Sequence, residues 1–391
     1  MQTNIITMKK NKKPLSLLFC GDFAPCRRWY KKEPNTNVFG NSLKFIKNSD
    51  LAFVNLECPT IKEGKPIVKD GPNLSTNPKW LESLKEANFN LLGLANNHFG
   101  DYGEKTVVEN IDNCKKIGLN TVGAGSNLKE AQKVFYFEKN NIKIAIIAVC
   151  EHEFGIAKEN KAGTAPLELI DNLQQIQDAR KNADFVIFTI HGGNEYFPYP
   201  RPNLRKKCKF YIKQGCDAII CHHPHVPGAY EIYEGKPIFY SLGNFLFDND
   251  NPLSGWNEGY MVRLELSNQI YFELIPYTQS FEQSGIKLMV DSEKDSFLKR
   301  IEDYKNTLYD KEKYEKIWNE FCKTKKDNYL ILQYSPLYFK GIGRILKKFG
   351  VAKVLLTNIK RLASRLNHIR CESHRETFIN ILENELLKKG K

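Results

Sequence analysis

The segment from Ile219 to His225 constrains the fold more than any other part of this 391-residue chain. An apolar run there ends in Cys-His-His-Pro-His, which is typical of a buried strand whose carboxyl end brings imidazoles together. Because side chains alternate along a strand, we expect His223 and His225 to point together and His222 to point elsewhere. Pro224 cannot continue a hydrogen-bonded ladder, so the histidines should lie on the exit loop. Two converging imidazoles are half of a metal site.

Other apolar runs in the first half of the chain also end in side chains that can bind a metal. Ligands of open α/β sheets gather outside the carboxyl ends of the strands. We therefore expect these side chains to meet at one edge of the fold. The five strand ends carry Asp22, Glu57, Asn97 with His98, His191, and His223 with His225.

The order of the elements indicates the fold class. Early strand-like runs alternate with helical patterns, whereas those between 231 and 274 follow one another through short turns. This order favours an α+β fold, a four-layer α/β/β/α sandwich, over a plain doubly wound sheet. We expect a loosely ordered N-terminus over 1–14, a domain over 15–280, and a basic helical extension over 281–391, where no strand signal remains.

Residues 336–370 hold nine of the Lys and Arg residues and no Asp or Glu, in a chain of net charge +13. An apolar stripe from Ile345 to Leu366 predicts a basic amphipathic helix, or two helices separated near Gly350. Three interpretations stay open: a helix packed on the protein's own core, a peripheral helix on anionic lipid, and a nucleic-acid-binding helix. The last is the least favoured, because no reading motif accompanies the charge.

Ten scattered cysteines show no paired spacing, which favours reduced thiols. Cys150 and Cys221 lie close to the expected site but are interpreted as packing residues. The N-terminal segment has no signal-type apolar region, and no run is long enough to span a bilayer. We expect a cytoplasmic protein, with peripheral contact at the inner face of the membrane through 336–370 as the alternative.

A cluster of carboxylates, an amide oxygen and histidines suits divalent Zn, Mn, Fe or Co. Two such ions about 3.5–4 Å apart can bind a phosphate oxygen and activate water for in-line attack. A further histidine beside them can protonate the leaving group.

Six ordered motifs give the chain a resemblance to a known family. They are Gly21-Asp22, Asn55-Leu56-Glu57, Ala95-Asn96-Asn97-His98, His191-Gly192-Gly193-Asn194-Glu195-Tyr196, His222-His223-Pro224-His225-Val226 and Tyr240-Ser241-Leu242-Gly243-Asn244-Phe245. Together, over Leu15 to Tyr277, they resemble the CapA family of capsule and poly-γ-glutamate synthesis, whose domain is similar to the calcineurin-like metallophosphoesterases.

The resemblance implies a role for each motif residue. It implies that Asp22 and His225 bind a first metal and that Glu57 bridges. The remaining implied roles are Asn97, His191 and His223 as ligands of a second metal, His98 as the catalytic acid, and Arg27 as a clamp for phosphate or carboxylate.

The chain departs from the metallophosphoesterase pattern at two places. No histidine stands two residues after Asp22, and the bridging acid is Glu57 where an aspartate is usual. The first metal therefore has fewer ligands, and one or two bound ions (Mn, Zn or Fe) both stay open.

Taken singly, each of these residues has an ordinary structural explanation, such as a turn acid or a helix cap. Their joint order at strand ends favours a metal site. His152 could line the pocket or pair with its acidic neighbours. His222, His368 and His374 are interpreted as structural or surface residues, and Gly243 and Asn244 as turn residues.

Two functions follow from the resemblance. The first is metal-dependent hydrolysis of a phosphoester, with a small-molecule or polymeric anionic substrate. The second is a non-catalytic accessory that binds an anionic polymer or a lipid-linked intermediate during capsule assembly.

Overall fold

The fold is described from a computed structural model over residues 13–27, 34–69, 71–247, 249, 253–280, 285–334 and 359–389. Most of the expected N-terminal segment 1–14 and most of the basic stretch 336–370 lie outside these residues. Within them, no helix combines the length and apolarity needed to cross a bilayer.

One sheet mixes parallel and antiparallel strands in the order β16-β15-β14-β1-β2-β3-β4, with β13 also paired to β1. Strands β1, β2, β3 and β4 run parallel, so their carboxyl ends share one edge. Strand β2 is buried along its whole length, as its apolar run over residues 51–54 favours. The bounds are β1 Leu15–Ala24, β2 Leu51–Leu56, β3 Leu91–Gly93, β4 Asn120–Val122, β13 Asn244–Phe247, β14 Glu258–Leu266, β15 Ile270–Ser280 and β16 Gly285–Leu288.

The second sheet has the order β11-β12-β10-β9-β7-β6. Strands β7, β9, β10 and β12 are parallel, and β6 joins β7 through Asn140 and Asn141, both in the left-handed region that such a hairpin turn needs. A small two-stranded sheet pairs β5 Ala124–Gly125 with β8 Gly163–Thr164. The bounds are β6 Phe135–Lys139, β7 Ile142–Cys150, β9 Phe185–His191, β10 Ala218–His222, β11 Tyr230–Tyr233 and β12 Lys236–Phe239.

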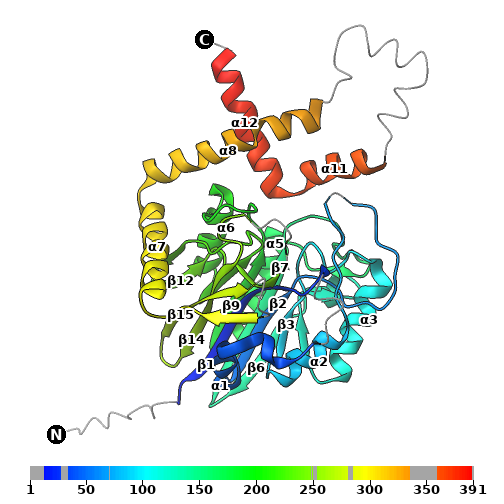
Figure 1. Cartoon of the computed structure of the whole chain (residues 1–391), viewed down its shortest axis with the longest axis vertical. Coiled ribbons are helices and arrows are strands. Elements are labelled where there is room, and N and C mark those ends of the chain that lie inside the picture. The colour runs from blue at the N-terminus through cyan, green and yellow to red at the C-terminus, as the bar shows by residue number, and fades with distance from the viewer. Residues whose placement is uncertain are drawn as a thin grey trace, which may run out of the picture.

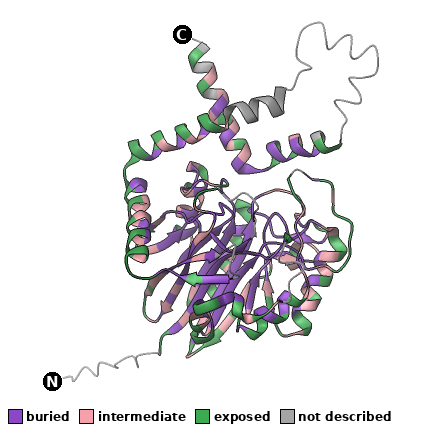
Figure 2. Cartoon of the chain, viewed as in Figure 1, coloured by how far each residue is buried: buried purple, intermediate pink, exposed green. Residues whose placement is uncertain are grey.

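Three apolar cores define four layers. The middle core joins the facing sides of the two sheets, with Phe19 and Val262 from one and Ile146 and Ile220 from the other. The outer faces are covered by two separate sets of helices, which make the remaining cores. Figure 2 shows the strands buried and the outward helix faces exposed. The predicted α/β/β/α sandwich is confirmed.

The covering helices begin and end where the sequence indicates. Pro202 stands in the first turn of α6, where its missing N–H costs nothing, and Gly118 follows α3 in the left-handed region. On the outer face of the first sheet lie η2 Thr36–Ser42, α1 Leu43–Asn48, α2 Lys79–Glu86 and α3 Gly103–Lys116, and on the second α4 Leu128–Ala131, α5 Leu169–Asn182 and α6 Pro202–Lys213.

The expectation of helices alone after residue 281 is wrong for one element. Strand β16 adds a short edge strand to the first sheet through β15, and four residues are too few to give a readable alternation. The extension then comprises α7 Asp291–Tyr309, α8 Lys311–Tyr334, α11 Ile359–Arg370 and α12 Glu372–Lys389. Helix α7 runs down the side of the domain, while α8, α11 and α12 lie over one end of the sheets (Figure 1).

Candidate metal centre

The polar strand ends of both sheets meet beneath the C-terminal helices. Asp22 lies near the end of β1, Glu57 directly follows β2, and His191 ends β9. All three are at most 3% exposed. Because the strands that carry them are parallel within each sheet, their carboxyl ends converge from two sheets on one place.

A β-bulge positions Asp22. The pairing of β1 with β2 shifts between Cys20 and Asp22, and such a bulge redirects the side chain that follows it. Gly21 is required there, because a Cβ atom would lie 2.0 Å from the carbonyl oxygen of Gly243. Asp22 then accepts hydrogen bonds from the Asn55 side chain (2.8 Å) and from the His223 backbone N–H (3.2 Å).

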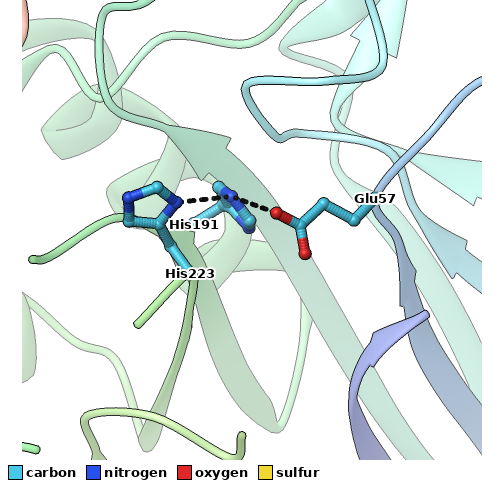
Figure 3. A group of neighbouring side chains, drawn as sticks. All are labelled: Glu57, His191 and His223. Atoms are coloured by element: carbon cyan, nitrogen blue, oxygen red, sulfur yellow. Dashed lines mark hydrogen bonds and ion pairs between the residues drawn. The ribbon is translucent and has the colours of Figure 1, made fainter. Parts of the chain in front are cut away.

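Glu57 stands between two groups of candidate ligands. Its Oε1 atom lies 3.5 Å from Nε2 of His191 and 3.6 Å from Nε2 of His225. Figure 3 shows the carboxylate of Glu57 and the ring of His223 on either side of His191. Neither oxygen of Glu57 accepts a hydrogen bond from any described residue, although both are buried. A buried carboxylate without a donor is costly unless a cation binds it.

The group around His191 has metal-ligand spacing. From Nε2 of His191, Oδ1 of Asn97 is 3.0 Å away, Nδ1 of His223 is 3.2 Å away, and Oε1 of Glu57 is 3.5 Å away. Metal–ligand bonds of about 2.0–2.2 Å in a tetrahedral site separate neighbouring donors by roughly these distances. The donor set therefore fits a borderline divalent ion.

The second group consists of Asp22, Glu57 and His225, whose candidate donor atoms lie within 4.8 Å of one another. Nδ1 of His225 lies 3.5 Å from Oδ2 of Asp22 and donates to Oδ1 of Asn244 at 3.0 Å. Asn244 was interpreted as a turn residue, but it begins β13 and orients this ring. The group has fewer donors than the first, as the missing histidine after Asp22 implied.

The surroundings of Glu57 and Asp22 shift the pKa values of the two carboxyl groups in opposite directions. Burial raises the pKa of the Glu57 carboxyl well above its ordinary value, and the charge of Asp22 adds to the effect. Burial acts in the same direction on Asp22, but the nearby rings of His222 and His225 outweigh it and hold the pKa of Asp22 well below its usual range. Burial, with the neighbouring His223, lowers the pKa of His191 well below its ordinary value.

His222 does not point away from the site, so that prediction is wrong. Its Nδ1 atom lies 3.3 Å from Oδ1 of Asp22. Strand β10 ends at this residue, and His223 and His225 follow with backbone φ angles of 99° and 59°. Strand alternation therefore does not govern these rings. The positive φ angles of His223 and His225 turn both rings toward Glu57. Backbone strain of this kind is typical of functional loops.

His98 is held by a buried ion pair. Its Nδ1 atom lies 2.8 Å from Oδ2 of Asp101, whose other oxygen accepts from Nζ of Lys69 at 2.5 Å. Asn96 fixes this turn by accepting from the backbone N–H groups of His98 and Phe99. Burial lowers the pKa of His98, the nearby Lys69 acts in the same direction, and Asp101 opposes both.

Arg27 is exposed at the end of the described segment 13–27 and does not line the cavity beside the metal centre. His152 belongs to neither donor group. It contacts Glu168 at 2.9 Å and Glu372 at 2.7 Å.

A cavity of about 310 Å³ lies beside the centre, with walls from two parts of the chain. Asn97, His98 and His223 contribute from the domain. The C-terminal helices cover the cavity and form its roof. His368 and His374 belong to these helices and line the cavity, so the interpretation of them as surface residues is wrong. The lining residues of the extension are Phe321, Lys325, Asn367, His368, Ser373 and His374.

Ion pairs and hydrogen bonds fix this roof. Buried Arg201 pairs with Glu151 of the domain and, at 2.5 Å, with Glu376 of α12. Burial alone would raise the pKa of the Glu372 carboxyl, but hydrogen bonding and the charge of His152 hold it at about 2. In return, the hydrogen bond to Glu372 raises the pKa of His152.

The sequence did not single out several residues that hold the site. Asn55 and Asn244 each lie within one of the six ordered motifs, and that position was the sequence signal that could have indicated a role at the site. Asp101 follows His98 by three residues, a spacing that could have indicated a partner. The lining and anchoring residues of α8, α11 and α12 carry no such signal, because only the folded chain brings them to the site.

Comparison with known proteins identifies the family. The family described as "Bacterial capsule synthesis protein PGA_cap" matches residues 16–249. The capsule biosynthesis protein CapA of Bacillus anthracis is 34% identical over 228 residues, which cover 56% of this chain and 54% of that protein. The PGA biosynthesis protein CapA of Bacillus subtilis is 33% identical over 249 residues, which cover 62% and 64%. The matched part is thus less than two thirds of either relative.

Solved structures with a similar backbone share little sequence with this chain. A Mycoplasma pneumoniae protein described as a novel phosphatase aligns with a TM-score of 0.40 and 16% identity, covering 68% of this chain and 94% of that one. A hypothetical protein from Thermus thermophilus aligns with a TM-score of 0.43 and 15% identity, covering 71% and 100%. The family match includes the whole second sheet, strands β1, β2, β3, β4 and β13 of the first sheet, and all the strand-end motifs. The resemblance inferred from those motifs is confirmed: the chain belongs to the bacterial capsule synthesis (PGA_cap) family.

Proposed function

We propose that this chain is a divalent-metal-dependent hydrolase that cleaves a phosphoester during synthesis of capsule, poly-γ-glutamate or a related surface polymer. The observation that carries the proposal is Glu57, a fully buried carboxylate without a hydrogen-bond donor, placed between His191 and His225. Such a group is costly to bury as an anion unless a cation binds it.

The side chains that would hold one ion are Glu57, Asn97, His191 and His223. Asp22 and His225, together with Glu57, would hold the other ion, the one called the first metal in the sequence analysis. When bound, a divalent ion of the Mn, Zn or Fe class supplies Lewis acidity, which lowers the pKa of a water molecule and offsets charge on a phosphoryl oxygen.

His98 would give the leaving-group oxygen its proton. Asp101 accepts from Nδ1 of His98, which leaves Nε2 for the substrate. A lowered pKa makes the His98 imidazolium a stronger acid. Lys69, paired to the same Asp101, fixes that carboxylate and adds positive charge to the cavity wall.

The test combines metal analysis with turnover of p-nitrophenyl phosphate and bis-p-nitrophenyl phosphate, with Mn or Zn added. We expect metal-dependent hydrolysis that His223→Ala and Asp22→Asn abolish. Asp178→Asn, the same chemical change on an exposed part of α5, is the matched control and should keep wild-type turnover. Bound metal without turnover on phosphate, ester and amide substrates would refute the hydrolase.

One observation favours a second candidate, a non-catalytic accessory that binds an anionic polymer or lipid-linked intermediate. Both oxygens of Asp22 already accept protein hydrogen bonds, one from Asn55 and the other from the His223 backbone. A carboxylate so satisfied gains less from a second ion, and a site with one ion can bind an anion but lacks the clamp that two ions place on the attacking and leaving oxygens. Tight binding of a polyglutamate or polyphosphate without hydrolysis would support this candidate.

A further inference from the structure

A second cluster of potential ligands lies where the C-terminal extension meets the domain. Helices α11 and α12 join at Cys371, over the carboxyl ends of the strands (Figure 1). Cys371 is 0% exposed. It faces the loop that follows β7, which carries Glu151 and Glu153.

The cluster brings together a thiol, a carboxylate and an imidazole. Candidate donor atoms of Glu153, Cys371 and His374 all lie within 4.8 Å of one another. Sγ of Cys371 is 3.8 Å from Oε1 of Glu153 and 3.8 Å from Oε2 of Glu151. Bonds of about 2.3 Å to sulfur and 2.0–2.2 Å to oxygen or nitrogen give ligand separations of this order. Glu151 therefore stands within reach of a fourth position.

The charge around Cys371 is unbalanced. Arg201 offsets the carboxylate of Glu151, but none of the Lys or Arg side chains described in the structure forms an ion pair with Glu153. Burial, followed by the charges of Glu153 and Glu151, raises the pKa of the Cys371 thiol well above its ordinary value. A dication between these groups would reverse that cost, because thiolate and carboxylate would then both be ligands.

We propose that Glu153, Cys371 and His374 form a separate binding site for a thiolate-accepting divalent metal of the Zn class, which fastens the C-terminal helices over the catalytic cavity. Cysteine, histidine and glutamate are all ordinary ligands of Zn, whereas a soft sulfur ligand disfavours Mg and Ca. Glu153 belongs to the domain, Cys371 lies at the α11–α12 junction and His374 lies in the first turn of α12, so binding joins parts distant in sequence.

The protein holds these ligands in place by contacts that need no metal. Glu372, next to Cys371, pairs with His152, and Thr377 accepts from Asn194 at 3.1 Å. A site prepared in this way loses little conformational entropy on binding.

The new site also contacts the first one. Oε2 of Glu153 accepts from Nδ2 of Asn97 at 3.4 Å, while Oε1 faces Cys371. Asn97 contributes its Oδ1 atom to the His191 group. A metal bound at the α11–α12 junction would therefore orient Asn97, a ligand of the proposed catalytic centre, as hydrogen-bond partners of metal ligands do.

The test is titration of the full-length, chelator-treated protein with Co²⁺ under a non-thiol reductant. We expect a sulfur-to-cobalt charge-transfer absorption whose final amplitude corresponds to one thiolate-bound Co²⁺ per protein, whatever amount of Co²⁺ the catalytic centre also binds. The absorption should disappear in Cys371→Ser, and Co²⁺ affinity at this site should fall at least tenfold in His374→Ala and Glu153→Gln. Circular dichroism confirms folding, and should Cys371→Ser fail to fold, the other two variants carry the test.

Two controls separate this site from the proposed catalytic centre. Cys26→Ser changes the cysteine whose charge acts on Glu57 and should keep the absorption. Glu57→Gln removes the carboxylate shared by both catalytic donor groups and should also keep it, whether or not the protein is a hydrolase. Absence of the absorption in the wild type at saturating Co²⁺, or its persistence in Cys371→Ser, would overturn the proposal.

Discussion

Replacing Glu57 by glutamine should stabilise the metal-free protein and remove most of the stabilisation that a bound metal gives. In the metal-free protein the carboxylate is fully buried, accepts no hydrogen bond from a described residue, and has a raised pKa because of burial and the charge of Asp22. An amide of nearly the same volume removes the charge and can donate to Asp22. We therefore expect metal-free Glu57→Gln to be more stable than the wild type at neutral pH.

The magnitude follows from the cost of an unsatisfied buried group, about 1–3 kcal/mol and more for a charged one. At roughly 2–4 °C per kcal/mol, the melting temperature of the metal-free variant should rise by several degrees. The sign depends on pH. The folded protein holds a proton that the unfolded chain releases above the ordinary value of 4.5, so the penalty grows as pH rises to the folded pKa. The stability that Glu57→Gln gains over the metal-free wild type should vanish near pH 4.5 and reach its full size above the raised pKa of Glu57.

Metal should reverse the order of stability. A ligand at a concentration 100 times its Kd stabilises the folded state by about 2.7 kcal/mol. Glu57 belongs to both donor groups, so the wild type should gain this amount with Mn or Zn and the variant should gain little.

The assay is thermal and urea unfolding of chelator-treated and metal-loaded protein at pH 7 and at pH 4.5. The matched control is Glu231→Gln, a change at another buried glutamate, which accepts from Arg205 at 2.8 and 2.9 Å. That variant should be destabilised with or without metal. A metal-free Glu57→Gln that is less stable than the wild type, or one that metal still stabilises fully, would refute the reasoning.

The remaining predictions concern catalysis, backbone and pH. His98→Asn should lower kcat by about 10²–10⁴-fold while metal content, measured by mass spectrometry, stays unchanged. Gly21→Ala places a Cβ against backbone and should cost more than 3 kcal/mol of unfolding free energy and weaken metal binding, whereas Gly235→Ala, with open space around it, should cost only about 1–2 kcal/mol. The His152–Glu372 pair should stabilise docking of α12 most between pH 4.5 and pH 6.5, the ordinary pKa values of the two groups, and less as pH rises through the raised pKa of His152 or falls toward 2. The rate at which a protease cleaves α12, measured against pH, should show this window, and Glu372→Gln should abolish it.

The sequence was sufficient to predict which side chains meet at the candidate metal centre, because most of them follow strands. An apolar run that ends in Asp22 or His191 specifies both a buried strand and a polar edge, and parallel strands bring such edges together. The two-sheet sandwich was predictable for the same reason, since alternating and hairpin-connected strands form distinct parts of the chain. These signals are local, and each can be read within about ten residues.

The remaining features depend on contacts that no local pattern encodes. His222 was misplaced because alternation within β10 says nothing of the opposing sheet, from which Asp22 reaches it. The roof was missed because Cys371 and His374 lie some 220 residues from the loop they cover. The basic stripe between Ile345 and Leu356 lies outside the described residues, so its three interpretations stay open.

The opposite pKa shifts of Asp22 and Glu57 assign them different parts in holding a cation. Asp22 is held as an anion, because the nearby histidines, the Asn55 side chain and the backbone N–H of His223 all stabilise its negative charge. Glu57 has no such partners, so its carboxylate is either neutralised by a proton or bound by a metal. The two compete for the same oxygen atoms, and metal affinity should therefore follow the protonation of Glu57 and not that of Asp22. Two carboxylates of one cavity with divergent acidities are a frequent sign of divided roles, and here the division comes from geometry: a β-bulge turns one toward donors, while the end of β2 leaves the other facing only imidazoles.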